Sequence, residues 1–463
     1  MRGAEINMLM SIILAAGAGT RMKSKLPKVL HKVSGISMLE HVIDVAEEIK
    51  CDKNVVVVGC GADKVKDATK HRNVEFIYQK EQLGTGHAVI QAENLICDEG
   101  YVIVLYGDTP LIKSETIQKF INLHIKRGYS ASILTTEVEN PTGYGRIIRN
   151  ENGEVIKIVE EKDADEFQKS IKEINSGIYC FKASDLKKSL KKLNNDNNQG
   201  EYYLTDVIEI LRNEEKKIGA YKIDDYTEIL GVNSRVQLAE AEKIMRKRIL
   251  TGLMEKGVTI IDPDNTYVDK RVEVGMDSIL YPGTFLLGNT EIGEDCIIGP
   301  NTRIENSIIN DRVKIINSTI IESFIDSDTK VGPYAYLRPN SKLGKNVKIG
   351  DFVEVKNSTI GDNSKASHLS YIGDGEIGTN VNIGCGAVFV NYNGKSKNKT
   401  VVKDNAFIGC NVNLIAPVIV EENGYIAAGS TITKNVPEKS LAVARAKQQN
   451  KKDWVERKGL LKK

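Results

Sequence analysis

The chain has 463 residues, of which 41% are hydrophobic and 27% are charged, with 64 Lys and Arg against 62 Asp and Glu. This length fits two or three domains, and the composition is that of a globular protein. A formal net charge of +2 and the lack of a long apolar run lead us to expect no nucleic acid partner and no membrane span.

The cysteines and the first residues of the chain point to a reducing compartment. The apolar run Ser11–Leu14 ends in a Gly-rich turn rather than a cleavage site, and residues 1–9 carry no pattern, so we expect a disordered lead-in rather than a signal peptide. The seven cysteines are scattered and form no CxxC pair, which argues against a disulfide framework or a zinc site and favours a cytoplasmic location.

Residues 10–234 alternate the patterns of strand and helix. Short apolar or β-branched runs predict strands, and apolar residues at helical spacing predict helices between them. We expect strands over Ser11–Leu14, Asn54–Val58, Val74–Tyr78 and Tyr101–Leu105, and helices over Met38–Ile49 and Gly86–Leu95. The prediction is an α/β doubly wound domain, with a mostly parallel sheet covered by helices on both faces and functional loops after Leu14 and Leu105.

A Gly-rich loop follows the first predicted strand: Leu14–Arg21 reads LAAGAGTR, and Leu26–Lys28 (LPK) comes soon after. A dinucleotide fingerprint needs a third Gly that opens directly into a helix, but here a Pro interrupts, and a Walker loop needs Gly where Met22 stands. The pattern favours a loop whose backbone amides approach a base and phosphates closely, with Arg21 and Lys28 to neutralise phosphate charge.

The sequence pattern changes after a charged helical stretch that we expect to form a linker helix over residues 235–256. From 257 to 463, short β-branched pieces recur with Gly at a six-residue step, as in Ile292-Gly293 then Ile298-Gly299. This period is typical of a left-handed parallel β-helix, whereas a β-sandwich does not keep it. The polar segment Phe389–Thr400 breaks the period, and such interruptions are more often functional than accidental.

Several segments of the second half carry side chains that acyl transfer needs. His368 is the only His after residue 124, and Tyr371 lies three residues beyond it. Glu354 and Lys356 fall on the same side of one predicted strand, and Arg338 adds a cation. N-acetylation by a thioester requires a base for the amine, a carboxylate that orients an imidazole base, an oxyanion donor and, for a sugar phosphate, cations. These residues supply most of that set.

Motifs in both halves carry a family resemblance. LAAGAGTR and LPK, followed in order by QLGTGH (82–87), YGD (106–108), TGYGR (142–146), IVE (158–160), NSG (175–177) and GVN (231–233), resemble sugar-1-phosphate nucleotidyltransferases. SHLSYIGD (367–374) and NYNGKSKNKT (391–400) closely resemble the acetyltransferase domain of the bifunctional N-acetylglucosamine-1-phosphate uridyltransferase/glucosamine-1-phosphate N-acetyltransferase family, the GlmU type. The match runs from about Met10 to Arg445.

The resemblance implies synthesis of UDP-N-acetylglucosamine in two steps. Acetyl-CoA acetylates glucosamine-1-phosphate, and the resulting N-acetylglucosamine-1-phosphate is coupled to UTP with release of pyrophosphate. The resemblance further implies Mg²⁺ as the metal cofactor, a homotrimer formed through the β-helix, and a bacterial cytoplasm in which cell-wall precursors are made. The domains are then a nucleotidyltransferase over 10–234 and an N-acetyltransferase over 257–463.

By the same resemblance, residues of the first half take roles in uridylyl transfer. Arg21 and Lys28 face the phosphates as catalytic cations, and Asp108 and Asn233 hold the metal. The uridine nucleotide is held by Leu14, Ala15, Ala16, Gly17, Gln79, Gly84 and Thr85, and the sugar by Gly145, Glu160 and Asn175. Lys28, Tyr106, Gly107 and Asn233 also belong to the implied site for UTP and UDP-N-acetylglucosamine.

In the second half, the resemblance makes His368 the general base and Glu354 the group that orients it. The family often has Ser where this chain has Cys410, and a thiol is a weaker hydrogen-bond donor, so either backbone N–H groups stabilise the transition state or acetyl transfer is slower. The acceptor sugar phosphate is bound by Arg338, Lys356, Tyr371 and Asn382, and acetyl-CoA contacts Cys385, Asn391, Tyr392, Cys410, Ala428 and Arg445.

Two other functions fit parts of the pattern. In a nucleotidyltransferase of the kind that makes ADP-glucose or GDP-mannose, the β-helix serves only assembly or regulation, but those relatives have shorter β-helical tails. A non-catalytic scaffold or nucleotide sensor would keep the folds and lose the chemistry. Such a decayed site should lack at least one of five residues, and all are present: Arg21, Lys28, Asp108, Asn233 and His368.

Overall fold

The computed structural model describes residues 8–462 of two compact units, Met1–Met245 and Arg246–Lys463. The division falls inside helix α8 (Arg235–Glu255), which agrees with the helix predicted for that stretch. Most of the predicted lead-in, residues 1–7, lies outside the described residues, and Leu9 already belongs to the first strand. None of the helices within 8–462 combines the length and apolar composition that crossing a bilayer requires.

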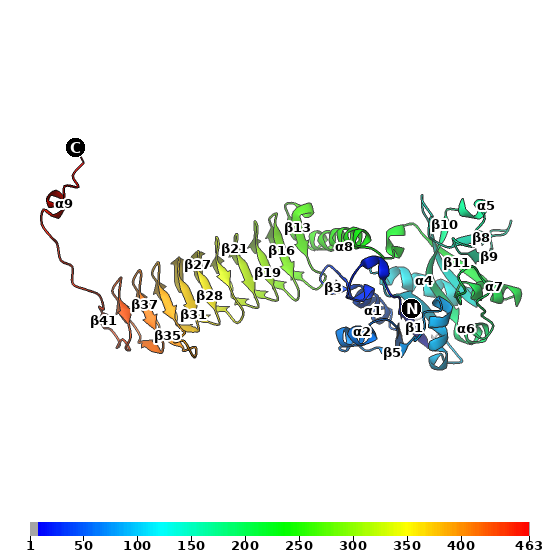
Figure 1. Cartoon of the computed structure of the whole chain (residues 1–463), viewed down its shortest axis with the longest axis horizontal. Coiled ribbons are helices and arrows are strands. Elements are labelled where there is room, and N and C mark those ends of the chain that lie inside the picture. Colours follow the sequence, from blue (N-terminus) through cyan, green and yellow to red (C-terminus); the bar gives the residue numbers. More distant parts are fainter. Residues whose placement is uncertain (1–7, 463) are drawn as a thin grey trace. The chain divides into compact units, whose positions relative to one another are not determined.

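The first unit is built on one mixed sheet in the order β11-β7-β10-β6-β1-β4-β5, with the hairpin β8–β9 at its side (Figure 1). Strands β1, β4, β5 and β6 are parallel, as predicted. Strand β10 runs antiparallel to both β6 and β7, which the sequence patterns did not predict. The bounds are β1 Leu9–Ala15, β4 Lys53–Val58, β5 Glu75–Tyr78, β6 Tyr101–Tyr106, β7 Ala131–Glu137, β8 Arg146–Arg149, β9 Val155–Val159, β10 Glu173–Lys182 and β11 Ile218–Ile223.

Helices cover both faces of this sheet, so the doubly wound prediction is confirmed. Ile13 of β1 packs in one core with residues of α1 and α4, whereas its neighbour Ile12 packs in the opposite core with residues of α3, α6 and α7. Because β1 is buried on both faces, its apolar residues form a continuous run rather than an alternating one. The helices are α1 Met38–Glu48, α2 Ala62–Thr69, α3 Thr85–Gln91, α4 Ser114–Arg127, α5 Glu166–Lys169, α6 Ala183–Leu190 and α7 Asp206–Asn213.

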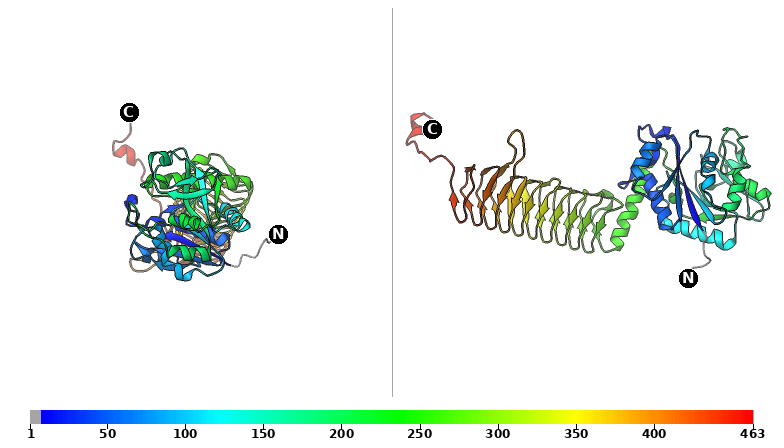
Figure 2. Two further views of the ribbon diagram at one scale, coloured as in Figure 1. Left: turned by 90° about the vertical axis from the view of Figure 1, so that its right-hand side faces the viewer. Right: turned by 90° about the horizontal axis from the view of Figure 1, so that it is seen from below.

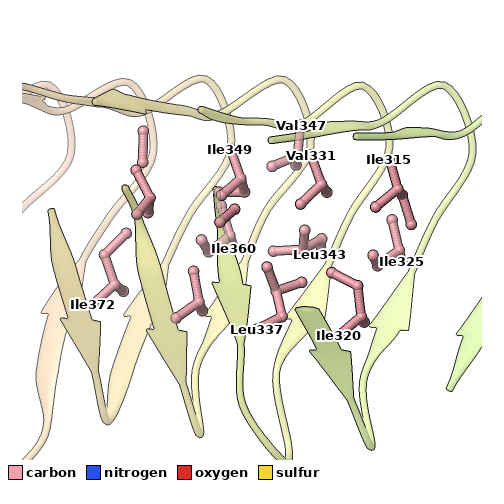
Figure 3. Close-up of a cluster of buried hydrophobic side chains, with 14 of the residues drawn as sticks. Ile315, Ile320, Ile325, Val331, Leu337, Leu343, Val347, Ile349, Ile360 and Ile372 are labelled. Atoms are coloured by element: carbon pink, nitrogen blue, oxygen red, sulfur yellow. The ribbon is translucent and has the colours of Figure 1, made fainter. Parts of the chain in front are cut away.

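The second unit is a left-handed parallel β-helix, as the six-residue period predicts. Short strands from β12 (Thr259–Ile260) to β41 (Leu441–Ala442) pass in turn to three sheets of 11, 10 and 9 strands (Figure 2). Each strand pairs in parallel with the strand one coil later. Aliphatic side chains from the three sheets meet inside the coils and form one continuous core, part of which Figure 3 shows: Ile315, Ile320, Ile325, Val331 and Leu337.

Buried hydroxyls at the corners of the coils fix the backbone of residues that the sequence singled out. Ser341 Oγ donates to the carbonyl oxygen of Arg338 at 2.6 Å, and Ser370 Oγ donates to that of His368 at 2.9 Å. The segment that breaks the period leaves the coil between β34 (Val388–Val390) and β35 (Thr400–Val402). It forms a loop with an antiparallel bridge between Tyr392 and Lys397.

Candidate functional sites in the two units

A cavity of about 360 Å³ lies beyond the carboxyl ends of β1, β5 and β6. The position is the one expected for ligands of an open α/β sheet. Four lining residues were not predicted: Val29, Gln82, Ala88 and Glu201. The predicted residues that line it are Leu14, Ala15, Ala16, Gly17, Lys28, Gln79, Gly84, Thr85, Tyr106, Asp108 and Asn233.

The Gly-rich loop after β1 leaves its backbone accessible to a ligand. Apart from Gly17 and its two chain neighbours, no described residue has an atom within 4 Å of the position that a Cβ on Gly17 would take. Gly19 has φ of 63°, and a Cβ there would meet Cβ of Lys28 at 2.6 Å, so the turn that brings Lys28 to the cavity requires glycine. Arg21 lies in the short 3-10 turn Thr20–Met22 and is exposed outside the cavity lining.

Two oxygen ligands converge near the mouth of this cavity. The ammonium of Lys28 donates to the Asp108 carboxylate and, at 3.0 Å, to Oδ1 of Asn233. Gln237 accepts from the backbone N–H of Asn233 at 2.8 Å, and the N–H of Val232 bonds to the carbonyl of Asp108 at 2.9 Å, which holds the two segments together. A carboxylate and an amide oxygen focused on one cation are hard ligands, so these residues fit a divalent metal of the magnesium type.

The three predicted sugar-binding residues lie together but outside the lining of that cavity. The N–H of Asn175 bonds to the carbonyl of Gly145 at 2.8 Å, and a Cβ on Gly145 would stand 3.4 Å from the Glu160 carboxylate. The ring of Tyr106 lies against Gly177, where a Cβ would approach it to 2.7 Å. Tyr106 also lines the cavity beyond β1, β5 and β6, so its aromatic ring links the two groups of residues. Gly107 joins Tyr106 to Asp108 and is buried.

Glu160 also lines a second cavity, of about 540 Å³, together with Thr205 and Asp206. Burial raises the pKa of Glu160, and a hydrogen bond from Thr205 opposes that shift. Burial raises the pKa of Asp206 to about 6, and the neighbouring charges of Glu209 and Asp163 add to the shift.

In the β-helix, three adjacent strands of one sheet bring the predicted acceptor residues together: β25 (Tyr336–Leu337), β28 (Glu354–Lys356) and β31 (Tyr371–Gly373). Arg338 follows β25, and its Nη1 donates to Oε1 of Glu354 at 2.9 Å. Glu354 pairs in register with Tyr371. The surface therefore carries cations beside hydroxyl and carboxylate groups, as a sugar phosphate requires.

The interrupting loop adds Asn391 and Lys397 to this surface, and the sequence reasoning missed Lys397 and Asp374, which Asn391 contacts. Asn391 donates to the carboxylate of Asp374 and, at 3.4 Å, to the hydroxyl of Tyr371. Lys397 faces Lys356, and this like-charged neighbour lowers the pKa of Lys397. Asp374 and Lys397 stand in the two motifs that carried the resemblance, which was the available signal for both. Tyr392 is exposed, and its hydroxyl donates within the loop to the carbonyl of Gly394.

The carboxylate that meets His368 is Asp351 and not the predicted Glu354. Nδ1 of His368 lies 2.7 Å from Oδ1 of Asp351, and the two residues pair in register on β27 (Lys348–Asp351) and β30 (Lys365–His368). The hydrogen bond from His368 lowers the pKa of Asp351. Glu354 lies on a different sheet, where it accepts from Arg338, so the structure brings Asp351 to His368 and does not bring Glu354 there.

Four of the residues predicted to contact acetyl-CoA follow one another along a single corner of the coils. The N–H of Asn411, which follows Cys410, donates to the carbonyl oxygen of Cys385. The N–H of Gly429, which follows Ala428, donates to the carbonyl oxygen of Cys410. Nη1 of Arg445 donates to the carbonyl of Ala428 at 2.7 Å. Asn382 lies apart from the other acceptor residues, in β33 (Asn382–Ile383), on the sheet that carries His368.

Three bulky side chains stand exposed beside the His368–Asp351 pair. Tyr334, Phe352 and Leu369 have φ of 60°, 56° and 36°, which lie in the left-handed region. Each of these residues is also 58% or 59% exposed to solvent. The rings of Tyr334 and Phe352 stack with centroids 5.5 Å apart. A bulky residue in the left-handed region costs of order 1–3 kcal/mol. At the corresponding position one coil before Tyr334, the residue with a left-handed φ is Asn317, which is not a bulky residue.

Comparisons with known proteins cover both units. Residues 10–229 match the nucleotidyl transferase family, and residues 322–442 match the GMPPB C-terminal domain. Three curated relatives are each described as bifunctional protein GlmU. The protein of Alkaliphilus metalliredigens is 57% identical over 455 residues, which are 98% of this chain and 100% of the relative. That of Acetivibrio thermocellus is 58% identical over 454 residues, 98% of each chain, and that of Alkaliphilus oremlandii is 60% identical over 455 residues, 98% and 100%.

Proposed function

The chain belongs to the GlmU family of bifunctional proteins, and we propose how its two units divide the reaction. It is a transferase that makes UDP-N-acetylglucosamine, by N-acetylation of glucosamine-1-phosphate with acetyl-CoA and by uridylyl transfer from UTP to N-acetylglucosamine-1-phosphate. The observation that carries the division is that the nucleotide cavity and the His368–Asp351 pair lie in different units. The relatives described as bifunctional over 98% of this chain argue against a β-helix used only for assembly and against a scaffold without chemistry.

In the first unit, UTP occupies the cavity and the sugar phosphate lies against Gly145, Glu160 and Asn175. A phosphate oxygen of the sugar attacks the α-phosphorus of UTP, the bond to the β-phosphate breaks, and pyrophosphate leaves. Such a reaction depends on positioning and charge stabilisation rather than on a covalent nucleophile. Lys28 at the cavity and Arg21 at the exposed edge of the loop supply positive charge beside the phosphates.

Members of this family use a divalent metal, and we assign Mg²⁺ to Asp108 and Asn233. The convergence of their two oxygens on the Lys28 ammonium supports this assignment. When bound, the metal neutralises phosphate charge that develops as pyrophosphate leaves. Lys28 lies within hydrogen-bonding distance of both ligands, so it adds its own charge at the same place.

In the second unit, His368 is the base for acetyl transfer. Asp351 accepts from Nδ1–H, so Nε2 keeps a lone pair that takes a proton from the amine of glucosamine-1-phosphate. The amine nitrogen bonds to the carbonyl carbon of acetyl-CoA, the carbon–sulfur bond breaks, and coenzyme A takes up a proton and leaves as the thiol. Arg338, Lys356 and Lys397 neutralise the sugar phosphate, and Tyr371 and Asn391 orient its hydroxyls.

The coenzyme lies along the corner that carries Cys385, Cys410, Ala428 and Arg445. Adjacent coils stack closely at this corner, because a Cβ on Gly384 or Gly409 would meet the backbone nitrogen of Cys410 or Ala428 at 2.6 Å. Where a thiol replaces the hydroxyl common in the family, we assign oxyanion stabilisation to backbone N–H groups, because a thiol is a weaker hydrogen-bond donor. Asn382 and Tyr392 complete the site from the neighbouring sheet and the loop.

The active assembly is a homotrimer in which another copy of the chain covers the ridge formed by Tyr334, Phe352 and Leu369. Three bulky residues with positive φ and more than half of their surface exposed support this arrangement, because burial against a partner offsets their conformational cost. The ridge adjoins both members of the catalytic pair.

Seven free cysteines support a cytoplasmic location, in which thiols stay reduced.

One mass-spectrometric assay tests the proposed function. Purified protein is incubated with glucosamine-1-phosphate, acetyl-CoA, UTP and Mg²⁺, and the products are identified by mass. UDP-N-acetylglucosamine and free coenzyme A are expected in equal amounts. Formation of UDP-N-acetylglucosamine only from a sugar phosphate that is already acetylated would overturn the roles assigned to the second unit.

A further inference from the structure

Arg146 carries one of the largest fully buried side chains among the described residues, with 1% of its surface exposed. It pairs in register with Val159 of β9 and with Ile174 of β10, and both strands run antiparallel to β8. The residue before Arg146 therefore lies beside the residues that follow Val159 and Ile174. These three residues are the ones assigned to the sugar: Gly145, Glu160 and Asn175.

The guanidinium of Arg146 lies on the face of the hairpin opposite to the carboxylate of Glu160. Successive side chains of a strand point to opposite faces, and the Cβ position of Gly145 is the one directed at Glu160. On its own face, Arg146 donates from Nη2 to Oε2 of Glu161 at 2.7 Å and to the carbonyl oxygen of Lys169 at 3.4 Å. Nη1 donates to the carbonyl oxygen of Tyr144. Any effect of Arg146 on the sugar therefore passes through its neighbours.

The carboxylate of Glu161 extends this network to the loop before β8. Its Oε2 also accepts from the backbone N–H of Gly143 at 3.2 Å. The hydrogen bond from Arg146 lowers the pKa of Glu161, so this carboxylate stays charged. The loop that leads to Gly145 is thereby held at two backbone groups, the N–H of Gly143 and the carbonyl of Tyr144. Hydrogen bonds to charged groups are the strong ones, so one guanidinium fixes the path of this loop.

We propose that Arg146 is a positioning residue for the sugar phosphate, which holds Gly145 and Glu160 in place from behind. It reaches Gly145 through the carbonyl of Tyr144 and Glu160 through the carboxylate of Glu161, the next residue on each strand. The inference rests on the proposed function, because it takes N-acetylglucosamine-1-phosphate as the ligand of these residues. Loss of the guanidinium releases both segments together, and small displacements of binding groups weaken productive binding strongly.

The test measures the KM for N-acetylglucosamine-1-phosphate and the KM for UTP in wild type, Arg146→Met and Arg146→Lys. Met fills much of the space of Arg but donates no hydrogen bond, whereas Lys keeps a charge for Glu161. The KM for the sugar phosphate should rise by about tenfold or more in Arg146→Met and by less in Arg146→Lys, while the KM for UTP changes little. Arg149→Met is the matched control, because Arg149 lies on the same strand and pairs with Glu173 of β10.

Each outcome separates the inference from the proposed function. An unchanged KM for the sugar phosphate in Arg146→Met overturns the role of Arg146 and leaves the proposed function intact. Equal rises of both KM values, or an equal effect of Arg149→Met, show a role in the stability of the unit alone and also overturn it. If Arg146→Met does not fold, Glu161→Gln keeps the inference testable, because it removes the charge that Arg146 pairs with and should raise the same KM. A wild type that does not couple N-acetylglucosamine-1-phosphate to UTP overturns the proposed function itself.

Discussion

Nδ1 of His368 lies 2.7 Å from a carboxylate oxygen of Asp351, which holds the paired position one coil earlier in the same sheet. The hydrogen bond lowers the pKa of Asp351, so the carboxylate stays charged while it orients the imidazole. Glu354 belongs to a different arrangement, in which it balances the charge of Arg338. The two carboxylates therefore have separate partners, His368 for Asp351 and Arg338 for Glu354.

Substitution of Asp351 should affect the rate of acetyl transfer and not the affinity for substrates. Asp351→Ala leaves the imidazole without its orienting charge, and kcat should fall by roughly a hundredfold, within the range of general-base catalysis. In Asp351→Asn, kcat should fall less, because Oδ1 of Asn still accepts a hydrogen bond from Nδ1–H of His368. Steady-state kinetics of coenzyme A release measures both, with uridylyl transfer by the same protein as the control. A larger loss of kcat in Glu354→Gln than in Asp351→Ala would contradict the reassignment.

Lys397 should contribute to binding of the acceptor. Its ammonium faces Lys356, and two like charges at one place are stabilised when a phosphate binds between them. Lys397→Ala should raise the KM for glucosamine-1-phosphate about tenfold with little change in the KM for acetyl-CoA. Lys395→Ala, an exposed lysine of the same loop, is the matched control. Equal effects of the two substitutions would show that only the net charge of the loop matters.

Removal of divalent metal should affect only one of the two activities. Chelation should abolish uridylyl transfer, because Asp108 and Asn233 then hold no cation for the phosphates, and should leave acetyl transfer unchanged. Asp108→Asn should raise the Mg²⁺ concentration needed for half-maximal uridylyl transfer by about tenfold or more, because a charged ligand is replaced by a neutral one. Loss of acetyl transfer on chelation would show that the β-helix depends on a metal as well.

Asp206 should lower the stability of the first unit at neutral pH. Burial raises its pKa from 3.8 to about 6, so the folded chain holds this proton more tightly than the unfolded chain does. The free energy of unfolding therefore decreases as pH rises from about 4 to about 6, and the full cost persists above that range. Asp206→Asn should raise the free energy of unfolding by on the order of 1 kcal/mol at about pH 8, after allowance for solvent screening, and by nothing below about pH 4.

Urea unfolding followed by helical circular dichroism measures this change, because helices α1–α7 all lie in the first unit. Asp196→Asn, in an exposed loop, is the control. A stabilisation of the same size at both pH values would point to packing or helix capping and would rule out the ionisation of Asp206 as its cause.

The local patterns of the sequence predicted most of the fold. Strand β4 and helix α1 were predicted to within one residue, because continuous apolar runs and helical spacing each have one dominant interpretation. The antiparallel direction of β10 was not predicted, because strand direction depends on how long connections return to the sheet. A single strand pattern carries no information on that.

The candidate site was predicted less completely, for a geometric reason. Glu354 was assigned to His368 by the family resemblance, whereas the carboxylate that lies beside His368 in the structure depends on which residues pair between coils. Asp351 and His368 become neighbours only once the register of β27 and β30 is known. Lys397 was missed because it stands in a loop without periodicity, whose path the repeat does not determine.

The most direct test of two independent sites in one chain is a mixing experiment with His368→Ala and Asp108→Ala. Each variant is incubated with glucosamine-1-phosphate, acetyl-CoA, UTP and Mg²⁺, alone and in an equimolar mixture, and UDP-N-acetylglucosamine is measured by mass spectrometry. We predict no product from His368→Ala, N-acetylglucosamine-1-phosphate alone from Asp108→Ala, and UDP-N-acetylglucosamine from the mixture. Failure of the mixture to form UDP-N-acetylglucosamine, or its formation by either variant alone, would contradict the account.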